Sequence, residues 1–458
     1  MKKIIINLFV ICISVFCACN KFLDINPSTQ SVNPSTIKDF QEMLNNDSLG
    51  TGYYFLVDFM SDDSRMVDAQ SGIGSTIYSR TYHWNSIIWN ASDTDMIYNS
   101  SYTRILQMNI ILSRVNSAPK DSLNTEENRS NVISQALINR AWYYLQLANI
   151  YGPTYNQSTA TTDLSVPLIL EPSSSSLPAR ATLQTMYGQI LADLKKAVSN
   201  TYLPSKGVDV LHPGKAAGYA LLARTYLYEA QYDSAMAYAD SSLALQNTLL
   251  NYNNTATQPI RLVDLSSNPE ILLGRLSFDA GFYLTYTGTF SISQSLSDSL
   301  DASDLRLSKN FTSGSYKISY STSPTSMVFD NSVGVPEVML IKAECLARKG
   351  NVSDAGAILK ELRSYRLKSS TVDTRVYNSS NILNCVLGER RRELYCHGGL
   401  RLFDLKRLNR EEAFKKTIYR KNDSNEIIDS LVPGSNLYLF PFAATIIANN
   451  TNIVQNPR

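Results

Sequence analysis

Two tryptophans with polar neighbours lie in an irregular part of the chain. Trp84 and Trp89, two of only three tryptophans in the sequence, stand close to Asn85, Asn90 and Asp93. A sugar presents C–H groups that pack on an indole or phenol face, while its hydroxyls need hydrogen-bond donors and acceptors beside that face. Long loops of this kind usually carry function. The ligand-binding residues predicted in this region are Tyr82, Trp84, Asn85, Trp89 and Asp93.

The same residues allow a second interpretation, in which one or both indoles anchor the loops to the scaffold. A ligand site would also need an opposite wall. For that wall we expect tyrosines from a second irregular stretch, namely Tyr283, Tyr286 and Tyr316.

Catalytic chemistry has little support in the sequence. The only histidines are His83, His212 and His397. There is no HExxH or CxxC spacing, and no glycine-rich phosphate loop follows a strand. The enzymatic interpretation that remains is a glycosidase using two loop aspartates, Asp62 or Asp63 with Asp93. We expect no enzyme activity, no cofactor and no metal site.

Residues 389–394 (ERRREL) hold five charges in one predicted helix. Acid catalysis would need carboxylates isolated across a cleft, whereas Glu389 and Glu393 are flanked by arginines that keep them ionised. Arginine–carboxylate pairs of this kind can hold a helix to the turn behind it. We therefore expect this block to stabilise the core.

The first residues have the pattern of a lipoprotein signal peptide. Lys2 and Lys3 precede an apolar run over 4–16, and that run ends at Ala18–Cys19. The run is too short to span a bilayer as a permanent helix. We predict that residues 1–18 are removed and that Cys19 carries a fatty acyl anchor of the palmitate type.

The composition describes a large and nearly neutral chain. Its 458 residues are 44% hydrophobic, and the net charge is +2, which gives no indication of nucleic-acid binding. No later segment is apolar enough to span a membrane. Beyond residue 19 the cysteines are Cys345, Cys385 and Cys396. This odd number cannot form a complete disulfide framework, and a Cys385–Cys396 bridge is left open.

Helical periodicity predicts the scaffold that must position these residues. Helices are expected over 36–47, 97–117, 130–150 and 182–198. Large and small residues over 219–239 follow the tetratricopeptide pattern of two nested helices, and 339–362 repeats it. The copies are separated by an insertion over 247–336 that is rich in Ser, Thr, Tyr and Gly.

Several short segments resemble one family. They are CNKFLDINP at 19–27, YHWN at 82–85, PEILL at 269–273, DLR at 304–306, ERRREL at 389–394 with DLKR at 404–407, LFPF at 439–442 and QNPR at 455–458. This set resembles the SusD/RagB-like nutrient-binding outer-membrane lipoproteins. Cys396-His397-Gly398 departs from the family's usual Phe-Glu-Gly and is followed by one extra residue before Arg401.

The resemblance implies a mainly α SusD-like fold, a tetratricopeptide-type helical scaffold with large irregular loop insertions. It implies one domain over 19–458, with an N-terminal half at 19–246, a loop-rich insertion at 247–336 and a C-terminal half at 337–458.

The resemblance also implies a role. Proteins of this family are lipid-anchored in the outer membrane, exposed at the cell surface, and pass nutrient to a SusC-like TonB-dependent transporter. We expect an oligosaccharide ligand. A peptide ligand, as in RagB-type members, is the alternative, and a glycoside hydrolase is the least favoured interpretation.

Overall fold

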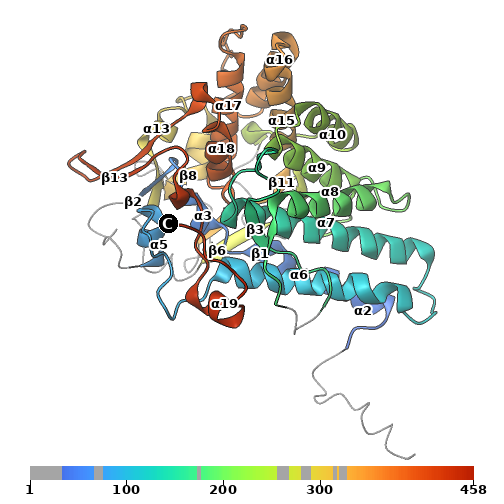
Figure 1. Ribbon diagram of the computed structural model, residues 1–458. Helices are drawn as coiled ribbons and strands as arrows, with labels where there is room; N and C mark the ends of the chain where they lie inside the picture. Colours follow the sequence, from blue (N-terminus) through green and yellow to red (C-terminus); the bar gives the residue numbers. More distant parts are fainter. Residues whose placement is uncertain are drawn as a thin grey trace, which may run out of the picture.

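The computed structural model describes residues 33–66, 76–172, 177–254, 268–279, 290–312, 317–318 and 327–458. Long helices lie side by side through one part of the molecule, and most of the short strands gather with the loops at the other (Figure 1). The predicted mainly α fold is confirmed.

Most of the long helices form one continuous stack. In the N-terminal half they are α2 (Ile37–Leu44), α6 (Met96–Arg114), α7 (Glu126–Tyr151), α8 (Leu183–Ser199), α9 (Lys215–Tyr228) and α10 (Tyr232–Leu245). In the C-terminal half they are α15 (Val335–Arg348), α16 (Val352–Ser364), α17 (Ile382–Glu393) and α18 (Leu400–Leu408), followed by the short α19 (Ala444–Asn449). From α6 to α10 each helix packs on the next, α10 packs on α15, and α15 packs on both α16 and α17. The tetratricopeptide-type pairs are therefore neighbours in space although the insertion separates them in sequence.

Small side chains allow the close packing of α9 and α10. Ala220 and Ala223 of α9 and Ala235 and Ala239 of α10 are all buried. The Ser242 hydroxyl of α10 also donates to the Ala216 carbonyl of α9, at 2.8 Å. This arrangement agrees with the alternation of large and small residues predicted over 219–239.

Capping side chains decide where the helices begin. Thr182 accepts a hydrogen bond from the Thr185 amide and starts α8, as its sequence suggests. The helix predicted over 130–150 begins four residues earlier, at Glu126, because Thr125 accepts from the Asn128 amide.

The described part of the insertion contains only short elements before α15 begins. Besides α19, the short α-helices among the described residues are α3 (Phe55–Asp58), α5 (Ile77–Tyr82), α13 (Gln294–Ser297) and α14 (Leu305–Asn310). The strands are β1 (Thr51–Gly52), β2 (Ser64–Met66), β3 (Leu164–Pro167), β4 (Arg180–Thr182), β5 (Ile271–Leu273), β6 (Leu276–Asp279), β7 (Phe290–Ile292), β8 (Phe311–Thr312), β9 (Lys317–Ile318), β10 (Met327–Asp330), β11 (Val333–Gly334), β12 (Ile418–Lys421) and β13 (Ile427–Leu431). One sheet has three strands in the order β1-β6-β10, and the other strands form pairs. Because β1 runs parallel to β6, with Thr51 opposite Leu276, the insertion is tied to the first loop region.

One hydrophobic core extends through the described residues from Tyr54 to Ile453, and a smaller one lies under α2. None of the helices in the described ranges has the length and apolar character needed to cross a membrane. Cys345, Cys385 and Cys396 are free thiols, so the Cys385–Cys396 bridge that the sequence left open is not formed.

The charged block of α17 lies inside the protein. Glu389 and Arg390 are each 1% exposed. Arg306 pairs with Glu389 and with Glu393, each at 2.7 Å, and Arg390 pairs with Asp404 of α18 at 2.8 Å. The block therefore lies in the core and is paired there, and its contribution to stability stays a prediction.

Candidate functional site

Trp84 lies in the core and is not an exposed platform. Its side chain is 2% exposed, its Nε1 donates to the Met60 carbonyl at 2.9 Å, and the Arg420 guanidinium lies 4.2 Å from the ring centre. The residue has a φ of 51° just after α5, a left-handed conformation that turns the chain at a helix end. The burial of this indole therefore argues against the expectation that it offers a face to a ligand.

Trp89 is also largely buried, at 6% exposed, but it lies between two surface grooves. Its Nε1 donates to the Pro441 carbonyl at 2.8 Å, which fixes the indole in place. Trp89 thus anchors its loop and also lines open space, and its role in ligand binding stays a prediction.

The first of these grooves, which we call the Asp93 groove, has a volume of about 380 Å³. This is within the range of ~300–1,000 Å³ for small-molecule sites. Half-buried Tyr53 and Tyr78 line it together with Trp89. Its polar groups come from α5 and from the turn before α6, and they include Arg80, Asn90 and Asp93.

Asp93 is held so that one carboxylate oxygen is occupied. Its Oδ2 accepts from Arg80 Nη2 at 2.8 Å and from the Asn90 amide at 2.7 Å. No hydrogen bond reaches Oδ1 from the described residues, and the side chain is 29% exposed. Arg80 is itself positioned by the Ile88 carbonyl, which accepts from Nε at 2.7 Å. The groove therefore presents a pre-oriented acceptor beside aromatic rings.

Two other predicted site residues, Tyr82 and Asn85, make contacts outside the two grooves. Tyr82 is 4% exposed under the Arg420 guanidinium, which lies 4.0 Å from the ring centre. The Asn85 carbonyl accepts from Arg458. Neither Tyr82 nor Asn85 is among the described residues that line the two grooves. The predicted opposite wall, Tyr283, Tyr286 and Tyr316, lies outside the described residues, as does Cys19.

The second groove, which we call the Ile87 groove, lies on the other side of Trp89 and has a volume of about 480 Å³. Ile87 is 65% exposed there. The lining is Ser86, Ile87, Ile88, Trp89, Pro441, Phe442, Ala444, Ile447, Ala448 and Gln455. The groove is thus formed by two segments more than 350 residues apart, as the Trp89–Pro441 separation of 352 shows.

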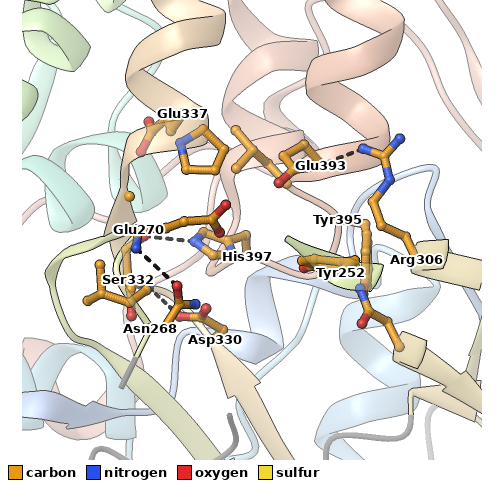
Figure 2. A pocket seen from close by; sticks show the side chains of 15 residues that line it. Tyr252, Asn268, Glu270, Arg306, Asp330, Ser332, Glu337, Glu393, Tyr395 and His397 are labelled. Carbon is orange, nitrogen blue, oxygen red and sulfur yellow. Dashed lines mark hydrogen bonds and ion pairs between the residues drawn. The ribbon is translucent and has the colours of Figure 1, made fainter. Parts of the chain in front are cut away.

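A third space is a small polar cavity of about 50 Å³ (Figure 2). Figure 2 shows the Glu393–Arg306 ion pair on one side and Glu270, Asn268 and His397 on the other. Glu270 pairs with Arg366 at 2.7 Å, and His397 Nε2 lies 2.7 Å from the Ser332 carbonyl. The cavity can hold a few water molecules but not a sugar ring, and its charged groups belong to the buried ion-pair network.

The aspartates considered for glycosidase chemistry are engaged elsewhere. Arg401 donates to both oxygens of Asp62, at 2.7 and 2.9 Å, and Arg391 Nε donates to Asp63 at 2.5 Å. Burial alone would raise the pKa of Asp62, but Arg401 lowers it well below its usual range. Both side chains are buried, and neither is among the described residues that line the Asp93 groove. The described residues also contain no cluster of His, Cys, Asp and Glu that could hold a metal ion.

Sequence reasoning missed several residues that line the two grooves. Tyr53 and Tyr78 belong to the aromatic stretch, and their irregular setting was the available signal. Arg80 and Ile87 had no distinguishing pattern. Phe442 and Ile447 reach the site only through the tertiary fold, so no local pattern could have identified them.

Two family models match the chain. A model described as starch-binding and associating with the outer membrane matches residues 21–227, and a SusD family model matches residues 335–458. No curated protein matches at a significant level.

Solved structures share the fold over nearly the whole chain. A SusD superfamily protein from Bacteroides thetaiotaomicron has a TM-score of 0.74 at 20% identity, covering 92% of this chain and 100% of that one. A SusD-like carbohydrate binding protein from Bacteroides vulgatus has a TM-score of 0.66 at 19% identity, covering 92% and 98%.

A third structure, a laminarin binding SusD-like protein, has a TM-score of 0.63 at 17% identity and covers 93% of this chain and 100% of that one. The family models match both halves of the helical scaffold, and these structures share its fold. The chain therefore belongs to the SusD/RagB family of outer-membrane-associated, carbohydrate-binding proteins.

Proposed function

We propose that this protein captures an oligosaccharide at the Asp93 groove and delivers it to a SusC-like TonB-dependent transporter. The observation that carries the choice of groove is Asp93 itself, which lines the groove with Trp89. Two donors hold its Oδ2, while none of the described residues bonds Oδ1. A carboxylate held in this way can accept hydrogen bonds from sugar hydroxyls, and the ligand does not first have to order its side chain.

The aromatic side chains supply the second requirement of glycan binding. Tyr53, Tyr78 and Trp89 give the groove apolar faces, and sugar C–H groups pack on such faces. Arg80 and Asp93 are the charged side chains among the described lining residues, and they pair with each other. A neutral polyhydroxyl ligand fits this pairing better than a strongly charged one.

Asp93→Asn tests the proposal. The amide has the same shape but loses charge and one acceptor, so glycan binding should weaken by ~1.5–3 kcal/mol, the usual worth of a hydrogen bond to a charged group. Affinity is measured by isothermal titration calorimetry against a panel of neutral glycans that includes laminarin.

Asp233→Asn serves as the matched control, because its side chain is 85% exposed on α10. It should bind like the wild type. If Asp93→Asn binds every glycan as tightly as the wild type while remaining folded, the Asp93 groove is not the site.

The peptide alternative and the enzymatic alternative each predict a different result. A peptide-binding protein of the RagB type would be saturated by a casein digest that then competes with the glycan, and we expect no competition. A glycoside hydrolase would release products from bound glycan, and we expect the glycan to be recovered intact by chromatography.

The lipid anchor and the transporter complex complete the proposal. Labelling with a fatty-acid analogue should mark the wild type but not Cys19→Ala, and protease treatment of whole cells should cut the protein if it faces outward. Mild detergent extraction should recover it with a TonB-dependent transporter. Purification without any such partner would contradict delivery while leaving glycan capture intact.

A further inference from the structure

The Ile87 groove adjoins the Asp93 groove but differs from it in chemistry. Trp89 lines both grooves, so the two spaces lie against one indole. The Asp93 groove presents a carboxylate and a guanidinium, whereas the Ile87 groove is lined mainly by Ile, Ala, Pro and Phe side chains.

The polar groups of the Ile87 groove are few and mostly engaged. The Gln455 side chain accepts from the Phe442 amide at 2.9 Å and donates to the Phe442 carbonyl at 2.8 Å. The Pro441 carbonyl already accepts from Trp89. Ser86 is left as the one side-chain hydroxyl of the described lining, so a bare polyol would find few partners here.

The apolar surface of this groove is held in place by the core. Phe442 stacks on Tyr151 with ring centres 4.9 Å apart, and the Arg180 guanidinium covers Phe442 at 5.0 Å. Ile87 and the exposed alanines of α19 then form the open side. A fixed apolar trough of this size can bury a short hydrocarbon group without reorganising.

We propose that the Ile87 groove binds an apolar substituent, such as an O-acyl group, of the same glycan whose sugar ring lies in the Asp93 groove. This inference rests on the proposed function and adds the ligand class, a glycan with an apolar substituent. Trp89 separates the polar half of such a ligand from its apolar half.

A series of alkyl β-glucosides tests the groove directly. Methyl, butyl and hexyl β-glucoside carry the same sugar and differ only in apolar length. Burial of each methylene should tighten binding by up to about fourfold, which is the conversion of the hydrophobic gain per CH₂. Binding is followed by the fluorescence of the protein, because Trp89 lies beside both halves of the probe.

Ile87→Asp should abolish the dependence on alkyl length, because it places a charge at the open side of the groove. Val208→Asp is the matched control, since Val208 is 79% exposed and does not line the groove. It should retain the wild-type series. Asp93→Asn should weaken every member of the series by the same factor.

An affinity that does not change from methyl to hexyl glucoside in the wild type overturns the inference, and so does a series that Ile87→Asp leaves unchanged. Either result is compatible with glycan capture at Asp93. A different result would contradict the proposed function itself. In that case, the affinities for laminarin and for the glucosides would be the same in Asp93→Asn as in the wild type.

Discussion

At the scale of single residues, the two tryptophans differ in what lies against them. Trp84 is enclosed by Arg420, whose guanidinium also covers Tyr82 and donates to the Phe59 carbonyl at 2.6 Å. Trp89 is anchored through its Nε1 but keeps surface next to two grooves. Only Trp89 can respond to a bound ligand by direct contact.

Trp84→Ala should therefore reduce stability and not ligand affinity. Removing a buried indole leaves a cavity, and we expect a loss of ~3–5 kcal/mol in the free energy of unfolding. Urea denaturation measures the loss. Ile87→Ala is the exposed comparison and should unfold like the wild type, whereas a stable Trp84→Ala protein with weakened glycan binding would place Trp84 in the site after all.

Asp58 is a buried carboxylate that should make stability depend on pH. It accepts from the Gly399 and Gly398 amides at 2.8 and 3.1 Å, but burial raises its pKa to about 8. Between pH 4 and pH 8 the folded protein keeps a proton that the unfolded chain has lost, so this group makes stability fall as pH rises. The slope is at most about 1.4 kcal/mol per pH unit.

Asp58→Asn removes this titration. The free energy of unfolding of the variant minus that of the wild type should be larger at pH 8 than at pH 5. Urea denaturation at both pH values measures this difference. Asp233→Asn controls for the loss of one negative charge at the surface. An Asp58→Asn difference that is the same at both pH values would mean that Asp58 is ionised throughout.

At the scale of elements, the turn between α17 and α18 shows how the chain accommodates its departure from the family motif. Cys396, Gly398 and Gly399 all have positive φ, at 46°, 63° and 90°. Asp58 of α3 binds the two glycine amides, and α18 begins at Leu400. The extra residue before Arg401 is thus absorbed in a tight left-handed turn that docks on α3.

Gly399→Ala should disrupt this turn. A Cβ would lie 2.6 Å from Val57 Cγ1, in a backbone conformation that alanine rarely adopts. We expect a loss of at least ~1–3 kcal/mol in unfolding free energy. The comparison is Gly188→Ala on the exposed face of α8, where nothing lies within 4 Å and a gain of ~1 kcal/mol is expected. Equal stabilities of the two variants would contradict this account of the turn.

The elements also show what the sequence could predict. A helix with one apolar face and a side-chain cap, such as α8, follows from local residues. The aromatic region was expected to be irregular, but its described residues include the short α3, β2 and α5. It supplies Trp89 and Asp93 to one groove. The sequence left open whether Trp84 anchors its loop, and its partner Arg420 could not be identified because it lies more than 330 residues further along the chain.

At the scale of the whole molecule, buried ion pairs join the insertion to the C-terminal half. Arg306 of α14 binds Asp304 at 2.7 Å and also reaches Glu389 and Glu393 of α17. Its side chain is 1% exposed, so these charges depend on one another for compensation.

Arg306→Met should lower the unfolding free energy by ~3–5 kcal/mol, because it leaves buried carboxylates without their cation. Arg65→Met is the matched surface change, since Arg65 pairs with Asp423 at 3.2 Å with about half of each side chain exposed. That pair should be worth no more than ~1 kcal/mol. Similar losses in the two variants, compared by urea denaturation, would show that the Arg306 network contributes little.

The contacts of α3 and the loop after it also constrain the order in which the chain can fold. Asp58 and Asp62 of this early segment bind Gly399 and Arg401, which follow 341 and 339 residues later. Among the described residues, the side-chain partners of these two aspartates all lie at residue 391 or later, so a nascent chain that ends earlier lacks them. Closing such distant contacts is slow. The early loops, which hold the proposed ligand groove, should therefore be the last part of the protein to reach their final structure.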